Sequence, residues 1–195
     1  MIQIKSKEDI EQQRISALKV GDTLAEVSKH IKPGVTTAYL DKIAEQYILD
    51  MGGVPTFKGY CGYPASLCIS INEVVVHGIP GKREIKEGDI VSIDCGVTYN
   101  DWVGDSAYTF ALKGVSEEVS QLLKVTKQSL YHGIDKCKIG QRVGDLSNCI
   151  QTYCEEFGYG VVRELCGHGV GRQMHEDPSV PNYGKKGTGP KFREG

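Results

Sequence analysis

The sequence predicts an α+β fold in which a helix–helix–antiparallel-strand unit occurs twice. Three observations lead to this prediction. Residues 88–110 alternate in the period-two pattern of β-strands, and a turn at Tyr99-Asn100-Asp101 divides them into a hairpin. Two amphipathic, helix-like segments precede this hairpin, and two more follow it. The two pairs of segments also match each other when they are aligned at a spacing of 106 residues.

The first half begins with two predicted helices. Ser6 is a suitable N-cap for the first helix, which carries apolar residues at helical spacing and is expected to end at Lys32-Pro33-Gly34. The second helix is expected to start after Thr36-Thr37. A loop rich in glycine and aromatic residues then leads to two predicted strands, at residues 67–72 and 74–76.

The second half repeats this order after Ser116, which opens a third predicted helix. The matched positions are Lys32 and Lys138, Gly34 and Gly140, Leu40 and Leu146, Tyr47 and Tyr153, and Gly52 and Gly158. Glycine stops make any two amphipathic helices look alike, but the matched order favours duplication. We therefore expect one domain over residues 1–195, with halves of about 1–111 and 112–195. Because Arg193-Glu194-Gly195 matches Lys86-Glu87-Gly88, which leads into the hairpin, we expect the last strands of the fold to be missing.

Composition excludes several classes of protein. The chain has 195 residues, of which 39% are hydrophobic and 25% charged, as in soluble globular domains. A net charge of −2 provides no general attraction to nucleic acid or membrane surfaces. No apolar run is long enough to span a bilayer, and the N-terminus leads into a charged helix and does not read as a signal peptide. Seven cysteines without a CxxC pair indicate reduced thiols in the cytoplasm.

One aspartate lies on each strand of the predicted hairpin, Asp94 and Asp105. A turn at Tyr99-Asn100 would place them directly opposite each other, and a turn at Asn100-Asp101 would make them diagonal neighbours on one face. Only a three-residue loop would separate them. An aspartate in a hairpin is usually a turn residue or a solvated side chain, but these two lie inside apolar strands. A bound cation or a shared proton would relieve their repulsion.

Three histidines lie near the predicted strands and loops. His77 follows a strand, His168 lies between two glycines in CGHGVG, and His175 lies in MHEDP. A single histidine near a strand end is more often a structural, hydrogen-bonded residue, but the glycines around His168 allow a ligand to approach closely. His30 and His132 lie on predicted helices and are expected at the surface.

Two carboxylates and an imidazole form a donor set suited to Mn²⁺, Fe²⁺, Co²⁺ or Zn²⁺. Carboxylates that can bridge favour a dinuclear centre, with metals about 3.5–4 Å apart. Histidines that are not ligands could then hydrogen-bond the scissile amide and assist the leaving amine.

The segments SINEVVVHGIP, DCGV, GDSA, GHGVG and MHEDP occur in an order that resembles the type I methionine aminopeptidases, which have the pita-bread fold. The resemblance covers essentially the whole chain. It implies that Asp94, Asp105 and His168 are metal ligands, with Asp105 bridging, and that His77 and His175 contact the substrate. The loop GYCGYPASLC resembles the methionine pocket of the family, which implies that its lining is Tyr60, Tyr63 and Cys68.

The resemblance also implies a reaction: hydrolytic removal of the first methionine from nascent chains with a small second residue, using two divalent metal ions. It implies a cytoplasmic monomer in transient contact with ribosomes. Family members carry two further glutamate ligands on strands beyond the position of Gly195. Two alternatives stay open, another pita-bread aminopeptidase and a non-catalytic binding module that keeps the fold.

Overall fold

The structure is a computed structural model that describes residues 1–195, and it contains two compact units. The hairpin unit consists of Lys7–Ser116 and Val170–Met174. The helical unit consists of Met1–Ser6, Glu117–Gly169 and His175–Gly195. Each unit is therefore built from segments that are far apart in the sequence.

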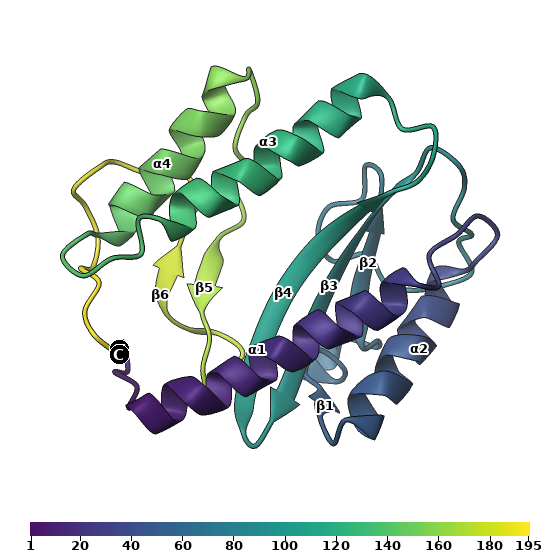
Figure 1. The fold of residues 1–195 in the computed structure, drawn as a ribbon, viewed down its shortest axis with the longest axis horizontal. Coiled ribbons are helices and arrows are strands. Elements are labelled where there is room, and N and C mark those ends of the chain that lie inside the picture. Colours follow the sequence, from purple (N-terminus) through teal and green to yellow (C-terminus); the bar gives the residue numbers. More distant parts are fainter. The chain divides into compact units, whose positions relative to one another are not determined.

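The hairpin unit is a four-stranded antiparallel sheet with two helices on one face (Figure 1). The central strand of the sheet pairs with all three of the others, two of them along one edge and the last along the opposite edge. Its elements are α1 (Lys7–Ser28), α2 (Thr37–Asp50), β1 (Val54–Pro55), the 3₁₀ helix η1 (Tyr60–Gly62), β2 (Leu67–Ile71), the central β3 (Ile90–Tyr99) and β4 (Trp102–Ala111).

The core of the hairpin unit lies between the sheet and its helices. Alternate residues of β3 are fully buried there, namely Val91, Ile93, Cys95 and Val97. Gly104 of β4 faces the same way, because a Cβ atom on it would lie 2.6 Å from the Ser16 backbone of α1. The β3 residues that alternate with these four buried ones point to the opposite face of the sheet. That face carries both aspartates of the hairpin.

The helical unit contains α3 (Glu117–Ile134), α4 (Val143–Glu156) and a two-stranded antiparallel sheet of β5 (Gly167–Gly169) and β6 (Glu176–Val180). The two helices approach closely at a glycine, since a Cβ atom on Gly133 would lie 2.9 Å from the Ile150 side chain. The first residues of the chain are tied to the last, because the Lys5 amide donates to the Gly195 carbonyl at 2.8 Å.

The predicted repeat appears in the backbone of the two units. Both α2 and α4 have 14 residues, and their first residues lie 106 positions apart. Gly34 and Gly140 precede them with left-handed φ angles of 87° and 91°. Each glycine also donates its amide to a later strand-like segment, at Ile85 and Phe192 respectively. Local sequence therefore produces the same helix entry twice.

Two predicted elements differ from the structure. The strand predicted at residues 74–76 is wrong, because left-handed φ angles at Asn72 and Val76 turn the chain away from the sheet. The first helix ends at Ser28, before the expected Lys32-Pro33-Gly34 stop, because the next three amides donate to carbonyls three residues back. None of the helices has the length and apolarity needed to cross a bilayer.

Candidate metal and substrate site

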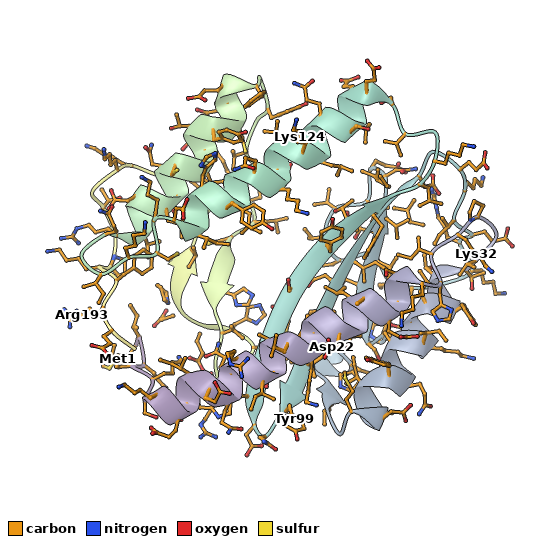
Figure 2. All side chains as sticks on the ribbon, viewed as in Figure 1. Met1, Asp22, Lys32, Tyr99, Lys124 and Arg193 are labelled. Atoms are coloured by element: carbon orange, nitrogen blue, oxygen red, sulfur yellow. The ribbon has the colours of Figure 1, made fainter.

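The turn of the β3–β4 hairpin determines how its aspartates face each other. Figure 2 shows Tyr99 at the tip of this hairpin. The two turn residues are Asn100 and Asp101, with left-handed φ angles of 49° and 64°, as in a type I′ turn. In the resulting register Asp94 pairs with Ala107 and Asp105 pairs with Gly96. Of the arrangements considered from sequence, the structure therefore has the diagonal one, on one face of the sheet.

Asp94 is perturbed by its burial and by the neighbouring carboxylate of Asp105. Partial burial, the charge of Asp105 and a hydrogen bond to Asp105 together raise the pKa of Asp94 to about 7. Two adjacent carboxylates form a pair that resists holding two negative charges. Carboxylate oxygens coordinate divalent cations, and a bound cation would remove the repulsion between the two aspartates. The pair therefore fits a metal ion by its donor chemistry.

Cys68 lies beside this pair, directly opposite Asp94 across the β2–β3 ladder. Burial and the negative charges of Asp94 and Asp105 raise the pKa of its thiol, although a hydrogen bond with Tyr63 opposes this. The Tyr63 hydroxyl lies 3.0 Å from the Leu67 carbonyl and 3.1 Å from the Gly78 carbonyl, and its pKa is also raised by burial. Tyr63 and Cys68, two of the three predicted pocket residues, are therefore neutral and held in place.

Sequence reasoning missed the residue that holds this loop against α2. A carboxylate oxygen of Asp41 accepts the backbone amides of Ser66 and Leu67, at 3.0 and 2.8 Å. Burial raises the pKa of Asp41, while these two hydrogen bonds act in the opposite direction. Asp41 looks like an ordinary helix-surface residue in the sequence, and no local signal connects it to a loop 25 residues away.

His77 lies at the edge of β2, on the far side of that strand from Asp94. The next residue, Gly78, accepts a hydrogen bond from the Ile69 amide at 2.8 Å and donates its own amide to the Ser70 hydroxyl at 3.1 Å. A Cβ atom on Gly78 would lie 2.2 Å from the Ile69 carbonyl oxygen, so only glycine fits there. The hydrogen bonds of Gly78, the residue after His77, thus place it beside Ile69 and Ser70 of β2.

The other two histidines come together in the helical unit. The ring centroids of His168 on β5 and His175, just before β6, are 4.2 Å apart. The His168 Nδ1 atom lies 2.9 Å from the Gly169 carbonyl oxygen. A carbonyl oxygen can only accept, so Nδ1 donates in this bond.

The predicted residues are thus divided between the two units. The hairpin unit contains Tyr60 and Tyr63 on the loop, together with Cys68, His77, Asp94 and Asp105. Tyr60 is exposed in η1. His168 and His175 lie in the helical unit. Within neither unit do three or more His, Cys, Asp or Glu side chains form a group that could hold a metal ion.

Comparisons with known proteins identify the family. Residues 11–195 match the model of Peptidase_M24, metallopeptidase family M24. The chain belongs to metallopeptidase family M24. All of it aligns with the methionine aminopeptidase of Clostridium acetobutylicum, at 54% identity over 78% of that protein. Methionine aminopeptidase 1 of Bacillus subtilis is 46% identical over 79% of its length.

Solved structures show the same fold. The methionine aminopeptidase of Rickettsia prowazekii superposes with a TM-score of 0.98 at 38% identity, covering all of this chain and 79% of that one. The prolidase of Pyrococcus horikoshii has a TM-score of 0.80 at 20% identity, over 94% of this chain and 52% of its own. The fold is therefore the predicted pita-bread fold, and membership of the family implies a divalent metal cofactor.

Proposed function

We propose that this chain removes the N-terminal methionine from nascent polypeptides whose second residue is small. The observation that carries the proposal is the diagonal pair Asp94 and Asp105, in a chain 54% identical to a methionine aminopeptidase. In the reaction, water adds across the first peptide bond, releasing free methionine and a polypeptide with a new N-terminus.

The metal site is proposed from the donors that each unit offers. Asp94 and Asp105 supply carboxylate oxygens, with Asp105 bridging, and His168 supplies an imidazole nitrogen. We propose two metal ions, of Co²⁺, Mn²⁺, Fe²⁺ or Zn²⁺, because mixed oxygen and nitrogen donors suit these cations. Bound there, such ions polarise a carbonyl group and lower the pKa of a bound water.

The remaining residues are proposed to bind and orient the substrate. Tyr60, Tyr63 and Cys68 would line the pocket for the methionine side chain. Neutral thiol and phenol groups suit a thioether, because they add no charge to an apolar pocket. His77 and His175 would hydrogen-bond the scissile amide and hold or donate the proton that the leaving amine requires.

The cellular setting follows from the same proposal. All seven cysteines are free, which is typical of a reducing compartment, and we place the reaction in the cytoplasm. A transient ribosome contact would bring the enzyme to nascent chains, and a monomer is the expected state.

The test compares peptides after reconstitution with Co²⁺ or Mn²⁺. We expect free methionine from Met-Ala-Ser and much less from Met-Leu-Ser, whose second residue is large. Metal analysis of the same sample should find bound metal, and a chelator should abolish the release. Cleavage of an Xaa-Pro dipeptide instead would indicate prolidase activity, and intact peptides with no bound metal would support a binding module.

A further inference from the structure

Two acidic side chains of α2 hold both ends of the loop that carries the proposed methionine pocket. We call residues 58–68 the pocket loop. It contains the three residues that are proposed to line the pocket, Tyr60, Tyr63 and Cys68. Asp41 and Glu45 lie four positions apart on α2, so their side chains share one face of that helix. Both carboxylates accept hydrogen bonds from the pocket loop.

The Asp41 carboxylate fixes the end of the pocket loop, where β2 begins. Its Oδ1 atom accepts the Ser66 amide at 3.0 Å and the Leu67 amide at 2.8 Å. The Leu67 carbonyl is held from the other side, because the Tyr63 hydroxyl donates to it at 3.0 Å. Leu67 is fully buried, and Cys68 follows it directly. The backbone between the two pocket residues is therefore fixed at both its amide and its carbonyl.

Glu45 connects the two ends of the pocket loop to each other. Its carboxylate accepts the Lys58 ammonium group at 2.6 Å and the Ser66 hydroxyl at 3.3 Å. The side chains of Lys58 and Glu45 are 47% and 30% exposed, so water screens this ion pair and it contributes little stability. The bonds to Asp41 are stronger, because a partly buried carboxylate accepts two backbone amides there. Asp41 is therefore the main support of the loop.

We propose that Asp41 is a positioning residue that holds Tyr63 and Cys68 in place and thereby determines how well the pocket distinguishes methionine from other side chains. This inference rests on the proposed function, because the pocket belongs to that proposal. Without Asp41, the Ser66 and Leu67 amides would lose their acceptor, and the start of β2 would move to pair them elsewhere. A pocket discriminates between side chains of similar size only while its walls stay in place.

The first experiment measures kinetics after reconstitution with Co²⁺. For Asp41→Ala we expect KM for Met-Ala-Ser to rise about ten-fold and kcat to change by about two-fold or less, because the pocket binds the side chain and the reacting groups are intact. The preference for Met-Ala-Ser over Leu-Ala-Ser should fall by about ten-fold. Asp41→Asn keeps an oxygen acceptor and should restore most of both. The control is Asp50→Ala, which removes an α2 carboxylate that is bonded to Gln46.

A second experiment tests the positioning without turnover, by alkylating thiols with iodoacetamide and following each cysteine by peptide mass spectrometry. Cys68 is 5% exposed, and Cys95, which pairs with Leu67 across the sheet, is fully buried. In Asp41→Ala we expect Cys68 to react about ten-fold faster and Cys95 at the wild-type rate, because the start of β2 opens locally while the core stays folded. Asp50→Ala should change neither rate.

The outcomes separate this inference from the proposed function. Unchanged labelling of Cys68 in Asp41→Ala would overturn the inference. Equal acceleration at Cys68 and Cys95 would also overturn it, because Asp41 would then stabilise the whole unit and not the pocket loop. The same holds for a fall in kcat with unchanged KM and unchanged preference between the two peptides. If Cys68 alone becomes reactive but the wild type releases no methionine, the proposed function fails and the positioning of Cys68 by Asp41 stands.

Discussion

The helices α2 and α4 have matching entries and different surroundings. Each has 14 residues and follows a left-handed glycine that is tied to a later segment. In α2, Leu40, Ala44 and Ile48 are fully buried against the hairpin unit. The equivalent face of α4 is buried only near its start, and Ile150 and Cys154 stay partly exposed. Local sequence thus determines the backbone of the repeat, whereas the sheet beside it determines how much it buries.

The largest expected effect tests whether both units contribute to the reaction. Asp105→Asn in the hairpin unit and His168→Gln in the helical unit should each lower methionine release from Met-Ala-Ser by at least about 100-fold, because each removes a proposed metal ligand. Asp101→Asn in the hairpin turn is the control and should keep most of the activity. Full activity of either ligand variant would remove that residue from the proposed site.

A second prediction concerns the difference in burial between α2 and α4. Leu40→Ala should reduce the free energy of unfolding by about 4 kcal/mol and Leu146→Ala by about 2 kcal/mol, both within the range for buried leucines. The difference is expected because Leu40 belongs to the main core cluster and Leu146 does not. Urea denaturation of both variants measures it. Equal losses would show that the two halves share the core more evenly than their burial indicates.

A third prediction concerns the left-handed glycine that precedes the second helix of each half. Gly34→Ala and Gly140→Ala should each cost about 1 kcal/mol, because both glycines have left-handed φ angles, although a Cβ atom at either position would meet open space. Gly21→Ala within α1 is the matched control, since its surroundings are also open but its backbone is helical. That substitution should stabilise the protein by about 0.5–1 kcal/mol. Thermal unfolding checks the signs, and opposite signs for Gly34 and Gly140 would contradict the backbone repeat.

The smallest expected effect on stability concerns the hydrogen bonds that cap the first turns of α2 and α4. The α2 entry uses the Thr36 hydroxyl, which accepts the Tyr39 amide, whereas at α4 the Asp145 carboxylate accepts the Arg142 and Gly187 amides. These bonds lower the pKa of Asp145. Its contribution to stability is therefore present above the unfolded-state pKa of about 4 and is lost as the pH falls through the lower folded-state value.

Asp145→Asn should accordingly be less stable than the wild type at neutral pH, with a difference that shrinks below about pH 4. Unfolding midpoints at several pH values measure this. Thr36→Ala is the comparison from the other half and should show a difference that does not depend on pH in this range. If the loss of stability in Asp145→Asn did not depend on pH, the Asp145 cap would act through hydrogen bonding alone and not through its charge.

Local patterns in the sequence predicted most of the fold. The helix starts at Thr37 and Glu117 and both strands of the hairpin follow from caps and alternation. The strand at residues 74–76 was predicted wrongly because three valines favour β-structure, but two left-handed residues override that preference. The sequence pattern also did not predict that α4 is less buried than α2, because the apolar faces of the two helices look alike in the sequence.

Within the candidate site, the sequence suggested candidate residues but not all of the contacts that hold them in place. Whether Asp94 and Asp105 lie directly opposite or diagonal to each other depends on which two residues form the turn, and only the observed register resolves that choice. The role of Asp41 arises from a contact with a loop 25 residues away, and that of Gly78 from the close approach of its backbone to β2, so neither follows from a local pattern. The ligand roles of Asp94, Asp105 and His168 stay proposals.

The most direct test of the central claim is metal binding by the carboxylate pair. Equilibrium dialysis with Co²⁺, followed by its visible absorption, should show bound metal for the wild-type chain at neutral pH. Asp94→Asn and Asp105→Asn should each weaken that binding by about 100-fold or more, and Asp101→Asn should leave it unchanged. Co²⁺ binding that persists unaltered in both Asp94→Asn and Asp105→Asn would contradict the assignment of this hairpin as the metal site.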